Sequence, residues 1–284
     1  MMKSMKTQKR VGAVIYHLFV VFLGIIMLYP IAWLILSSFK PGNQIFLNAA
    51  QLIPETFVLD NYRTGWAGFG GLTFTTFFKN SLIVTILTVI GQVCASTIVA
   101  YGFARIRFKA KAFWFACMVI TMLLPTQVLM IPQYIMFQKF GWLNSFLPLV
   151  VPAFTGLPFF IFLIIQFIRG IPKSLDESAY IDGCGKIRTF FTIVVPLCVP
   201  AIITSAIFSF YWKWDDFMGP LLYLQTPKLY TVSLALKSFS DPSAGTDWGS
   251  LFAMLVASLI PSFLIFIFFQ KYIVEGIATT GMKN

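Results

Sequence analysis

The charged and small residues best able to make specific contacts gather in one stretch, SLDESAYIDGCGKIR (Ser174–Arg188), between two long apolar runs. Ser174 and Glu177 form the S-x-x-E pattern of a capping box, in which each side chain bonds a free backbone N–H at a helix start. The pattern predicts a short polar helix that begins at Leu175, and Gly183 is expected to interrupt it. The chemistry that this stretch offers is hydrogen bonding and ion pairing.

One face of the predicted helix consists of small groups. Ser178, Ala179, Asp182 and Gly183 lie one, three and four residues apart, so they share a helix face. A helix resting on lipid headgroups would carry Lys or Arg above bulky apolar residues, whereas this one opens with acidic residues. Two interpretations remain, a polar loop helix at the membrane surface and a docking site for another protein, and the small face favours docking.

Signatures of catalysis are absent from the sequence. It contains no HExxH, GxSxG, GxGxxG or nucleotide-binding GxxxxGK[ST] motif. Its one histidine, His17, is expected to be an interfacial or packing residue near the start of the first apolar run. The cysteines form no CxxC pair and are expected to pack: Cys94, Cys117, Cys184 and Cys198. We therefore expect no enzyme, no metal site and no bound cofactor.

The elements that must position the polar stretch are six charge-free apolar runs. The chain is 58% hydrophobic and 11% charged, whereas soluble domains are about 45–50% apolar and about 25% charged. A large soluble core would need only one or two such runs, and the strands of a membrane barrel would alternate apolar with polar residues. Because backbone groups in lipid must bond within their own segment, the runs predict helices. The sequence predicts an all-α integral membrane protein, a single transmembrane domain over residues 1–284 with spans at about 13–37, 81–104, 112–137, 146–168, 190–212 and 250–270.

The distribution of Lys and Arg predicts the orientation of these spans. With the N-terminus inside, 14 of the 21 basic residues fall in cytoplasmic segments, which favours cytoplasmic tails at residues 1–10 and 271–284. The net charge of +11 then reflects topology and anionic lipid, not nucleic acid, because the basic residues are scattered over four loops. The first apolar run is about twice as long as a signal-peptide core and is expected to be a retained helix.

Two spans have unusual composition. In the second, Ser96, Ala100 and Ala104 recur every four residues, which predicts close helix packing. The third contains Pro125 and Pro132 in LLPTQVLMIPQY. Each proline removes a backbone hydrogen bond, and the sequence leaves open whether the helix is kinked or broken around a cavity.

The stretch ESAYIDGCGKIRTFFTIVVP resembles the EAA loop of membrane subunits of ATP-binding-cassette importers, E-A-A-x-x-D-G-A followed by I-x-x-P. The residues that match in identity and spacing are Glu177, Ala179, Asp182, Gly183, Ile193 and Pro196. Ser178 and Cys184 replace two alanines with other small residues. The segments SSFKPGNQIF, LDNY, AYGFARIRF, LPFFIFLIIQFIRGIPKSLDE and FYWKWDDFMGPLLYL are similar to the carbohydrate-uptake branch, specifically to the smaller six-span permease of the maltose importer.

The resemblance implies partners and an energy source. It implies a second homologous permease, a dimer of cytosolic ATPases that bind ATP and Mg, and an extracytoplasmic sugar-binding protein, all at a bacterial or archaeal cytoplasmic membrane. A coupling helix at about 174–187 would lie in a groove of one ATPase, where Glu177 would pair with a basic residue. The outer loop Thr226–Gly249 would face the binding protein, and a C-terminal tail near the ATPase would include Gly276, Gly281 and Lys283.

The implied function is import of a di- or oligosaccharide by alternating access. The residues expected along the sugar path offer aromatic rings and polar groups: Gln127, Gln133, Tyr134, Tyr211, Trp212, Trp214 and Asp215. For Trp and Tyr near span ends the alternative is an interfacial anchor. A channel would need a ring of selectivity groups. An ion-coupled carrier would normally show an internal repeat and broken helices in both halves, and a proton relay would need acidic residues within the spans, which are lacking.

Overall fold

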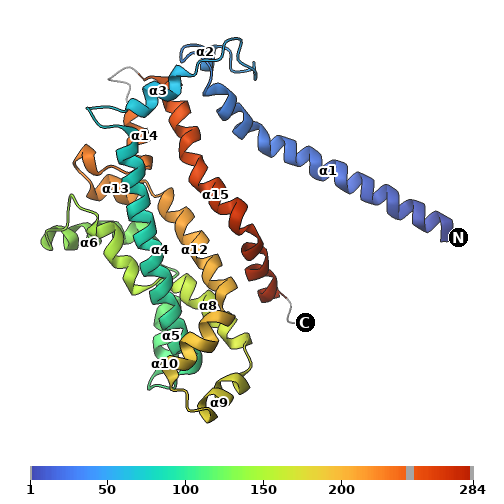
Figure 1. The fold of residues 1–284 in the computed structure, drawn as a ribbon, viewed down its shortest axis with the longest axis vertical. Coiled ribbons are helices and arrows are strands. Elements are labelled where there is room, and N and C mark those ends of the chain that lie inside the picture. The colour runs from blue at the N-terminus through green and yellow to red at the C-terminus, as the bar shows by residue number, and fades with distance from the viewer. Residues whose placement is uncertain (1, 241–245, 282–284) are drawn as a thin grey trace. The chain divides into compact units, whose positions relative to one another are not determined.

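The computed structural model describes residues 2–240 and 246–281, with side chains described from 12 to 240 and from 246 to 272. All regular secondary structure in these residues is helical. The chain forms two units, Met1–Gly71 with Leu236–Ser258 and Leu72–Ala235 with Leu259–Asn284. Figure 1 shows the helices coloured in chain order.

The first unit contains three helices of its own and parts of two others: α1 (Met2–Ser37), α2 (Gln44–Leu47), α3 (Asp60–Ala67), the end of α14 (Val232–Phe239) and the start of α15 (Trp248–Gly281). The amide nitrogen of Asn61 donates to the carbonyls of Ser38 and Lys40, at 2.8 Å each. Gly65 lies so close to Met254 that a Cβ would approach its Cγ to 2.9 Å. Asn61 of LDNY thus joins α3 to the SSFKPGNQIF segment, and Gly65 lets α3 lie close to α15.

The second unit contains most of the remaining helices. They are α4 (Phe74–Arg105), α5 (Lys111–Thr121), α6 (Thr126–Lys139), α7 (Leu147–Val150), the 3-10 turn η1 (Val151–Thr155), α8 (Pro158–Gly170), α9 (Lys173–Ile181), α10 (Lys186–Thr189), the π-helical segment η2 (Phe190–Val194), α11 (Val195–Leu197), α12 (Val199–Trp214), α13 (Met218–Tyr223) and the 3-10 turn η3 (Pro227–Leu229). The first turn of α14 and the rest of α15 complete it.

Helix α4 is central to the second unit and packs against α8, α12 and η1. The predicted small-residue stripe lies at this packing surface. A Cβ on Gly91 would approach the ring of Phe154 to 2.6 Å, and the Ser96 hydroxyl accepts the N–H of Leu157 at 3.0 Å. Ala100 is fully buried in the core cluster of α4, α8 and α12. Small side chains thus let the backbones approach closely, as the spacing predicted.

The helices confirm the all-α membrane fold, but two predicted spans are not straight. Four segments are long and apolar enough to cross a membrane: Gly12–Ser37, Phe74–Arg105, Leu147–Gly170 and Trp248–Tyr272. The pairs Lys111–Thr121 with Thr126–Lys139 and Lys186–Leu197 with Val199–Trp214 bend by 99° and 75°. If each bent pair is one span, the described residues contain six candidate membrane spans.

In the third run, 112–137, the bend decides between the kinked and the broken helix that the sequence left open, in favour of the broken one, whereas in the fifth run, 190–212, no break was predicted. The third run is broken before Pro125, whose ψ of 130° is extended, whereas Pro132 lies inside α6. The fifth contains the π-helical segment and breaks at Cys198. Helix α4 also begins at Phe74 instead of near residue 81, and α1 extends through most of the predicted N-terminal tail.

Candidate functional site

The polar stretch that follows α8 begins its helix earlier than predicted. Helix α9 starts at Lys173, with Pro172 as the preceding residue and no side-chain capping bond. The expected capping box is therefore wrong, because Ser174 lies inside the first turn. The fixed φ of proline already suits a helix start, so the chain turns helical before it reaches the serine.

The end of α9 is a Schellman motif. Gly183 has a φ of +80°, and its N–H bonds the carbonyl of Tyr180 at 3.1 Å while the N–H of Cys184 bonds that of Ala179 at 2.8 Å. This pair of bonds requires a left-handed residue, which glycine adopts without strain. The predicted coupling helix at about 174–187 thus consists of two helices, α9 and α10, and the turn between them lies at Gly183, where the interruption was predicted.

The predicted small face is divided between two sides of α9. Ala179 is buried beside Asp176, one turn earlier. Ser178, Asp182 and Gly183 are exposed. The expectation that all four small residues face a partner is wrong for Ala179, because the ion pair of Asp176 turns that side of the helix toward the chain. Its carboxylate lies 2.8 Å from the Nε of Arg105 at the end of α4.

The outward side of this loop carries apolar and acidic groups together. Ile181 and Ile187 are 87% and 76% exposed, and Glu177 is exposed one turn before Ile181. We call Glu177, Ser178, Ile181 and Ile187 the loop surface. Ile193 and Pro196, the last motif residues, lie instead in η2 and α11, where they belong to the bend of the fifth span.

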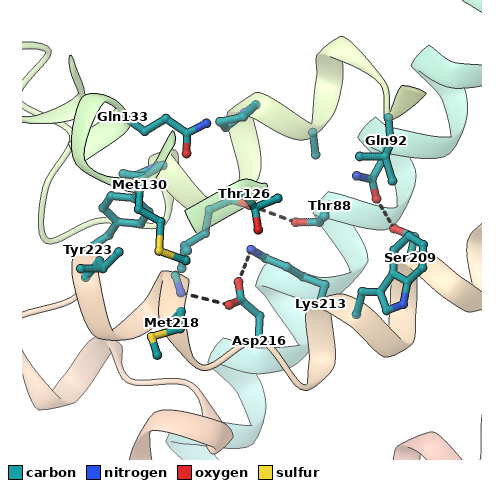
Figure 2. Close-up of a pocket in the computed structure, with 18 of the residues that line it drawn as sticks. Thr88, Gln92, Thr126, Met130, Gln133, Ser209, Lys213, Asp216, Met218 and Tyr223 are labelled. Carbon is teal, nitrogen blue, oxygen red and sulfur yellow. Dashed lines mark hydrogen bonds and ion pairs between the residues drawn. The ribbon is translucent and has the colours of Figure 1, made fainter. Parts of the chain in front are cut away.

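The second unit also contains a cavity of about 450 Å³ between α4, α6, η1, α12 and α13. Its lining is shown in Figure 2. The polar residues that line it are Thr88, Gln92, Thr126, Gln133, Ser209, Lys213 and Asp216, and the apolar ones include Met130, Phe137, Trp212, Met218 and Tyr223. The lining thus combines hydrogen-bonding groups with aromatic rings.

The charges in this cavity are paired with each other. The Nζ of Lys213 lies 2.9 Å from Oδ2 of Asp216, while Oδ1 accepts the N–H of Gly219 at 3.0 Å (Figure 2). A Cβ on Gly219 would approach the same carboxylate to 2.6 Å. Further along α4 and α12, the hydroxyl of Ser209 donates to Oε1 of Gln92 at 2.6 Å. Lys213 and Asp216 therefore add no net charge to the cavity, whose lining still offers polar groups.

Two of the residues predicted along the sugar path line the cavity. Gln133 and Trp212 do so, and the Trp212 ring lies parallel to Phe160, with ring centres 5.4 Å apart. The aromatic Tyr134 instead stacks on Tyr223.

The other predicted path residues lie apart from the cavity lining. Trp214 is buried against Phe210, and Tyr211 donates to the carbonyl of Ser262. Gln127 follows Thr126 without lining the cavity. Asp215 also does not line it, and burial raises the pKa of its carboxyl above the ordinary value.

Sequence reasoning missed the ion pair of the cavity. It selected Asp215 and passed over its neighbour Asp216, although Lys213 and Asp216 have the i, i+3 spacing of a helical ion pair. The partners Gln92 and Ser209 come from helices more than 100 residues apart in the chain, and no local pattern predicts such a contact.

Several other predicted features fall partly outside the described side chains. Gly276 and Gly281 lie in the backbone of α15, and Lys283 lies outside the described residues. The predicted outer loop Thr226–Gly249 contains η3 and α14, and its residues 241–245 are also outside them. The four cysteines are free thiols, and Cys198 packs in the core with Ala201.

Comparison with known families decides the class of the protein. Residues 92–279 match the family described as binding-protein-dependent transport system inner membrane component. The chain belongs to this family. The resemblance carried by the EAA-like stretch is thereby confirmed, and the chain is a transport permease.

Relatives of the permease match it over nearly all of its length. It is 35% identical to the probable ABC transporter permease protein YurM of Bacillus subtilis (strain 168) over 257 residues, 90% of this chain and 84% of the relative. It is 30% identical to the galactooligosaccharides transport system permease protein GanQ of the same organism, covering 100% of both chains. It is 32% identical to the trehalose/maltose transport system permease protein MalG of Thermococcus litoralis, covering 93% and 94%.

Among solved structures, the permease is similar in fold to a chain of a bacterial ABC transporter involved in the import of the acidic polysaccharide alginate. The TM-score is 0.80 at 20% identity, over 93% of this chain and 96% of that one. This similarity confirms that the arrangement of helices is that of an importer permease.

Proposed function

We propose that the permease is one of two homologous membrane subunits of an ATP-driven importer of di- or oligosaccharides. It would act in a bacterial or archaeal cytoplasmic membrane with both termini in the cytoplasm, and an extracytoplasmic binding protein would deliver the sugar. The family membership supports the permease role, and relatives named for galactooligosaccharides and for trehalose and maltose support the substrate class. The observation that carries the proposal is the loop surface on α9 and α10.

The loop surface has the chemistry of a docking site. Two isoleucines more than three-quarters exposed would be costly in water, and a hydrophobic groove on a partner would cover them. Glu177 forms no ion pair with any side chain that the structure describes, so its carboxylate is available to a basic residue of an ATPase. The partner ATPases would bind ATP and Mg, because this chain has no nucleotide-binding motif.

The cavity has the chemistry of a sugar path. Amides and hydroxyls from α4, α6 and α12 can bond sugar hydroxyls, and the half-exposed Trp212 offers a ring face for stacking. Because Lys213 and Asp216 neutralise each other, the lining favours an uncharged carbohydrate over a sugar acid. A second permease would complete the path, and alternating access would open it to each side in turn.

The docking proposal is tested by capture of the ATPase. We expect Ile181→Asp to lower the amount of ATPase that co-purifies with the permease pair by about tenfold or more, because it places a charge in an apolar contact. Ile181 is a better probe than Ala179, whose burial would confuse docking with misfolding. The matched control is Ile53→Asp, an isoleucine 65% exposed in the loop between α2 and α3.

The complete function is tested with the reconstituted importer. Vesicles containing both permeases and the ATPase, with ATP inside and liganded binding protein outside, should accumulate sugar. Normal ATPase capture by Ile181→Asp would refute the docking surface. Sugar uptake that persists without ATPase, or that follows an ion gradient, would refute the importer.

A further inference from the structure

The last turns of α4 hold the loop of α9 and α10 at three points. Before α9, Nη2 of Arg105 donates to the carbonyl of Ile171 at 2.8 Å. Within α9, Nε of the same arginine lies 2.8 Å from Oδ2 of Asp176. At the start of α10, the hydroxyl of Tyr101 donates to the carbonyl of Lys186 at 3.0 Å. The loop is therefore held before, within and after its first helix.

The central contact is a buried ion pair. The side chains of Arg105 and Asp176 are 6% and 9% exposed. Such pairs add little net stability because desolvation offsets their attraction, but loss of one partner leaves a buried charge uncompensated. The attraction between the two charges therefore favours the relative position of α4 and α9 in which they meet. Around the pair, Tyr101 packs against Phe190 with ring centres 4.9 Å apart, in a core that includes Ile168.

The same helix lines the cavity at its other end. Thr88 and Gln92 of α4 face the cavity, and Gln92 accepts the hydroxyl of Ser209 on α12. At 1.5 Å per residue, Gln92 lies about 20 Å from Arg105 along the helix axis. Helix α4 runs without a break from Phe74 to Arg105, so a displacement imposed at Arg105 reaches the cavity through one rigid element.

We infer that Arg105, Asp176 and Tyr101 are positioning residues that make α4 move with the loop, so that ATPase closure changes the cavity. This inference rests on the proposed docking of the loop to an ATPase. We call the three residues the α4 clamp. Without it, α9 and α10 could follow the ATPase on their own, since they are joined to the spans by short connections at Ile171–Pro172 and through η2. ATP would then be hydrolysed without movement of sugar.

The test compares transport with hydrolysis in the complete importer. In vesicles containing both permeases and the ATPase, Asp176→Asn should retain ATPase capture and hydrolysis. The number of sugars imported per ATP should fall about tenfold, because the neutral asparagine no longer attracts the buried Arg105. Tyr101→Phe removes a neutral bond and should lower the ratio less. Asp60→Asn, an exposed aspartate in α3, is the matched control and should leave the ratio unchanged.

A second variant separates coupling from folding. Asp176→Asn leaves Arg105 buried without its partner and could prevent assembly, whereas Arg105→Gln with Asp176→Asn removes both charges together. The double variant should assemble, bind the ATPase and remain uncoupled. A wild-type ratio of sugar to ATP in either variant would overturn the clamp. Loss of ATPase capture in the double variant would also overturn it, because the residues would then serve docking. Normal capture by Ile181→Asp would instead contradict the proposed docking surface.

Discussion

The loop surface and the cavity satisfy their polar groups in opposite ways. On the loop surface, Glu177 and the exposed isoleucines have little cover from the described chain. In the cavity, Lys213 pairs with Asp216 and Ser209 with Gln92. A surface left incomplete suits a permanent protein partner, whereas a lining already satisfied suits a ligand that must arrive and leave. Under the proposed function, the same chain would keep the surface that binds a partner tightly apart from the path through which a ligand passes.

The turn that ends α9 provides the strongest test of this contrast. Gly183→Ala forces a residue with a Cβ into the left-handed region, at a cost of about 1–2 kcal/mol, and should displace the loop surface. We expect ATPase capture to fall about tenfold, as 1.4 kcal/mol corresponds to that factor. Gly170→Ala is the control, because its added Cβ also meets no heavy atom within 4 Å but Gly170 does not have a positive φ. Equal capture by both variants would show that the turn does not hold the surface.

The ion pair of the cavity provides the next test. Asp216→Asn leaves the Lys213 ammonium without its counter-charge and should raise the KM for sugar uptake a few-fold, without changing ATPase capture. Asp215→Asn is the adjacent comparison. Since Asp215 does not line the cavity, it should alter KM less. A larger rise in KM for Asp215→Asn than for Asp216→Asn would indicate that Asp215 contacts the sugar, and it would contradict the proposal that the sugar passes through this cavity.

A smaller effect is expected from variants that weaken the packing of α4, the helix that contacts both the cavity and the loop. Ser96→Ala removes the acceptor of the Leu157 N–H and should lower the free energy of unfolding by about 1 kcal/mol, measured by thermal unfolding in detergent. Thr97→Val is matched to it, because the Thr97 hydroxyl bonds within its own helix to Val93. Thr97→Val should lower the free energy of unfolding less than Ser96→Ala does. An equal decrease would mean that the bond to Leu157 adds no stability of its own.

The smallest effect is expected at the aromatic wall of the cavity. Trp212→Phe keeps a ring beside Phe160 and removes only the indole N–H and some stacking area. The KM for sugar should rise about twofold or less, within the range of aromatic contributions. Trp214→Phe should leave KM unchanged, since Trp214 packs internally against Phe210. If only Trp214→Phe raised the KM, Trp214 and not Trp212 would be the residue that contacts the sugar.

The sequence predicted the features that depend on local pattern. Apolar runs and small-residue spacing predicted the helical membrane fold and the packing of α4 at Ser96 and Ala100. The EAA-like spacing predicted the family, and the glycine at position 183 predicted the interruption of the helix. These succeed because helical periodicity and backbone strain are properties of neighbouring residues.

Some features that the sequence missed depend on partners far away in the chain, and others on the local course of the backbone. Ala179 faces inward because Asp176 meets Arg105, and these two charged residues are separated in the chain by four α-helices, α5 to α8, and the 3-10 turn η1. The pairing of Lys213 with Asp216 depends on a turn after α12 that composition does not specify. Of the two prolines in the third run, only Pro125 lies at the break, directly before the start of α6, while Pro132 lies inside α6, although both remove the same backbone donor.

The π-helical segment Phe190–Val194 joins α10 to the apolar helices of the fifth run. A π turn accommodates about one residue more than an α turn, and one residue corresponds to about 100° of rotation in an α-helix. Deleting a residue there would restore an ordinary helix and swing α9 and α10 around its axis. Insertion or loss of one residue in this segment would therefore redirect α9 and α10 while the helices that follow it kept their own alignment.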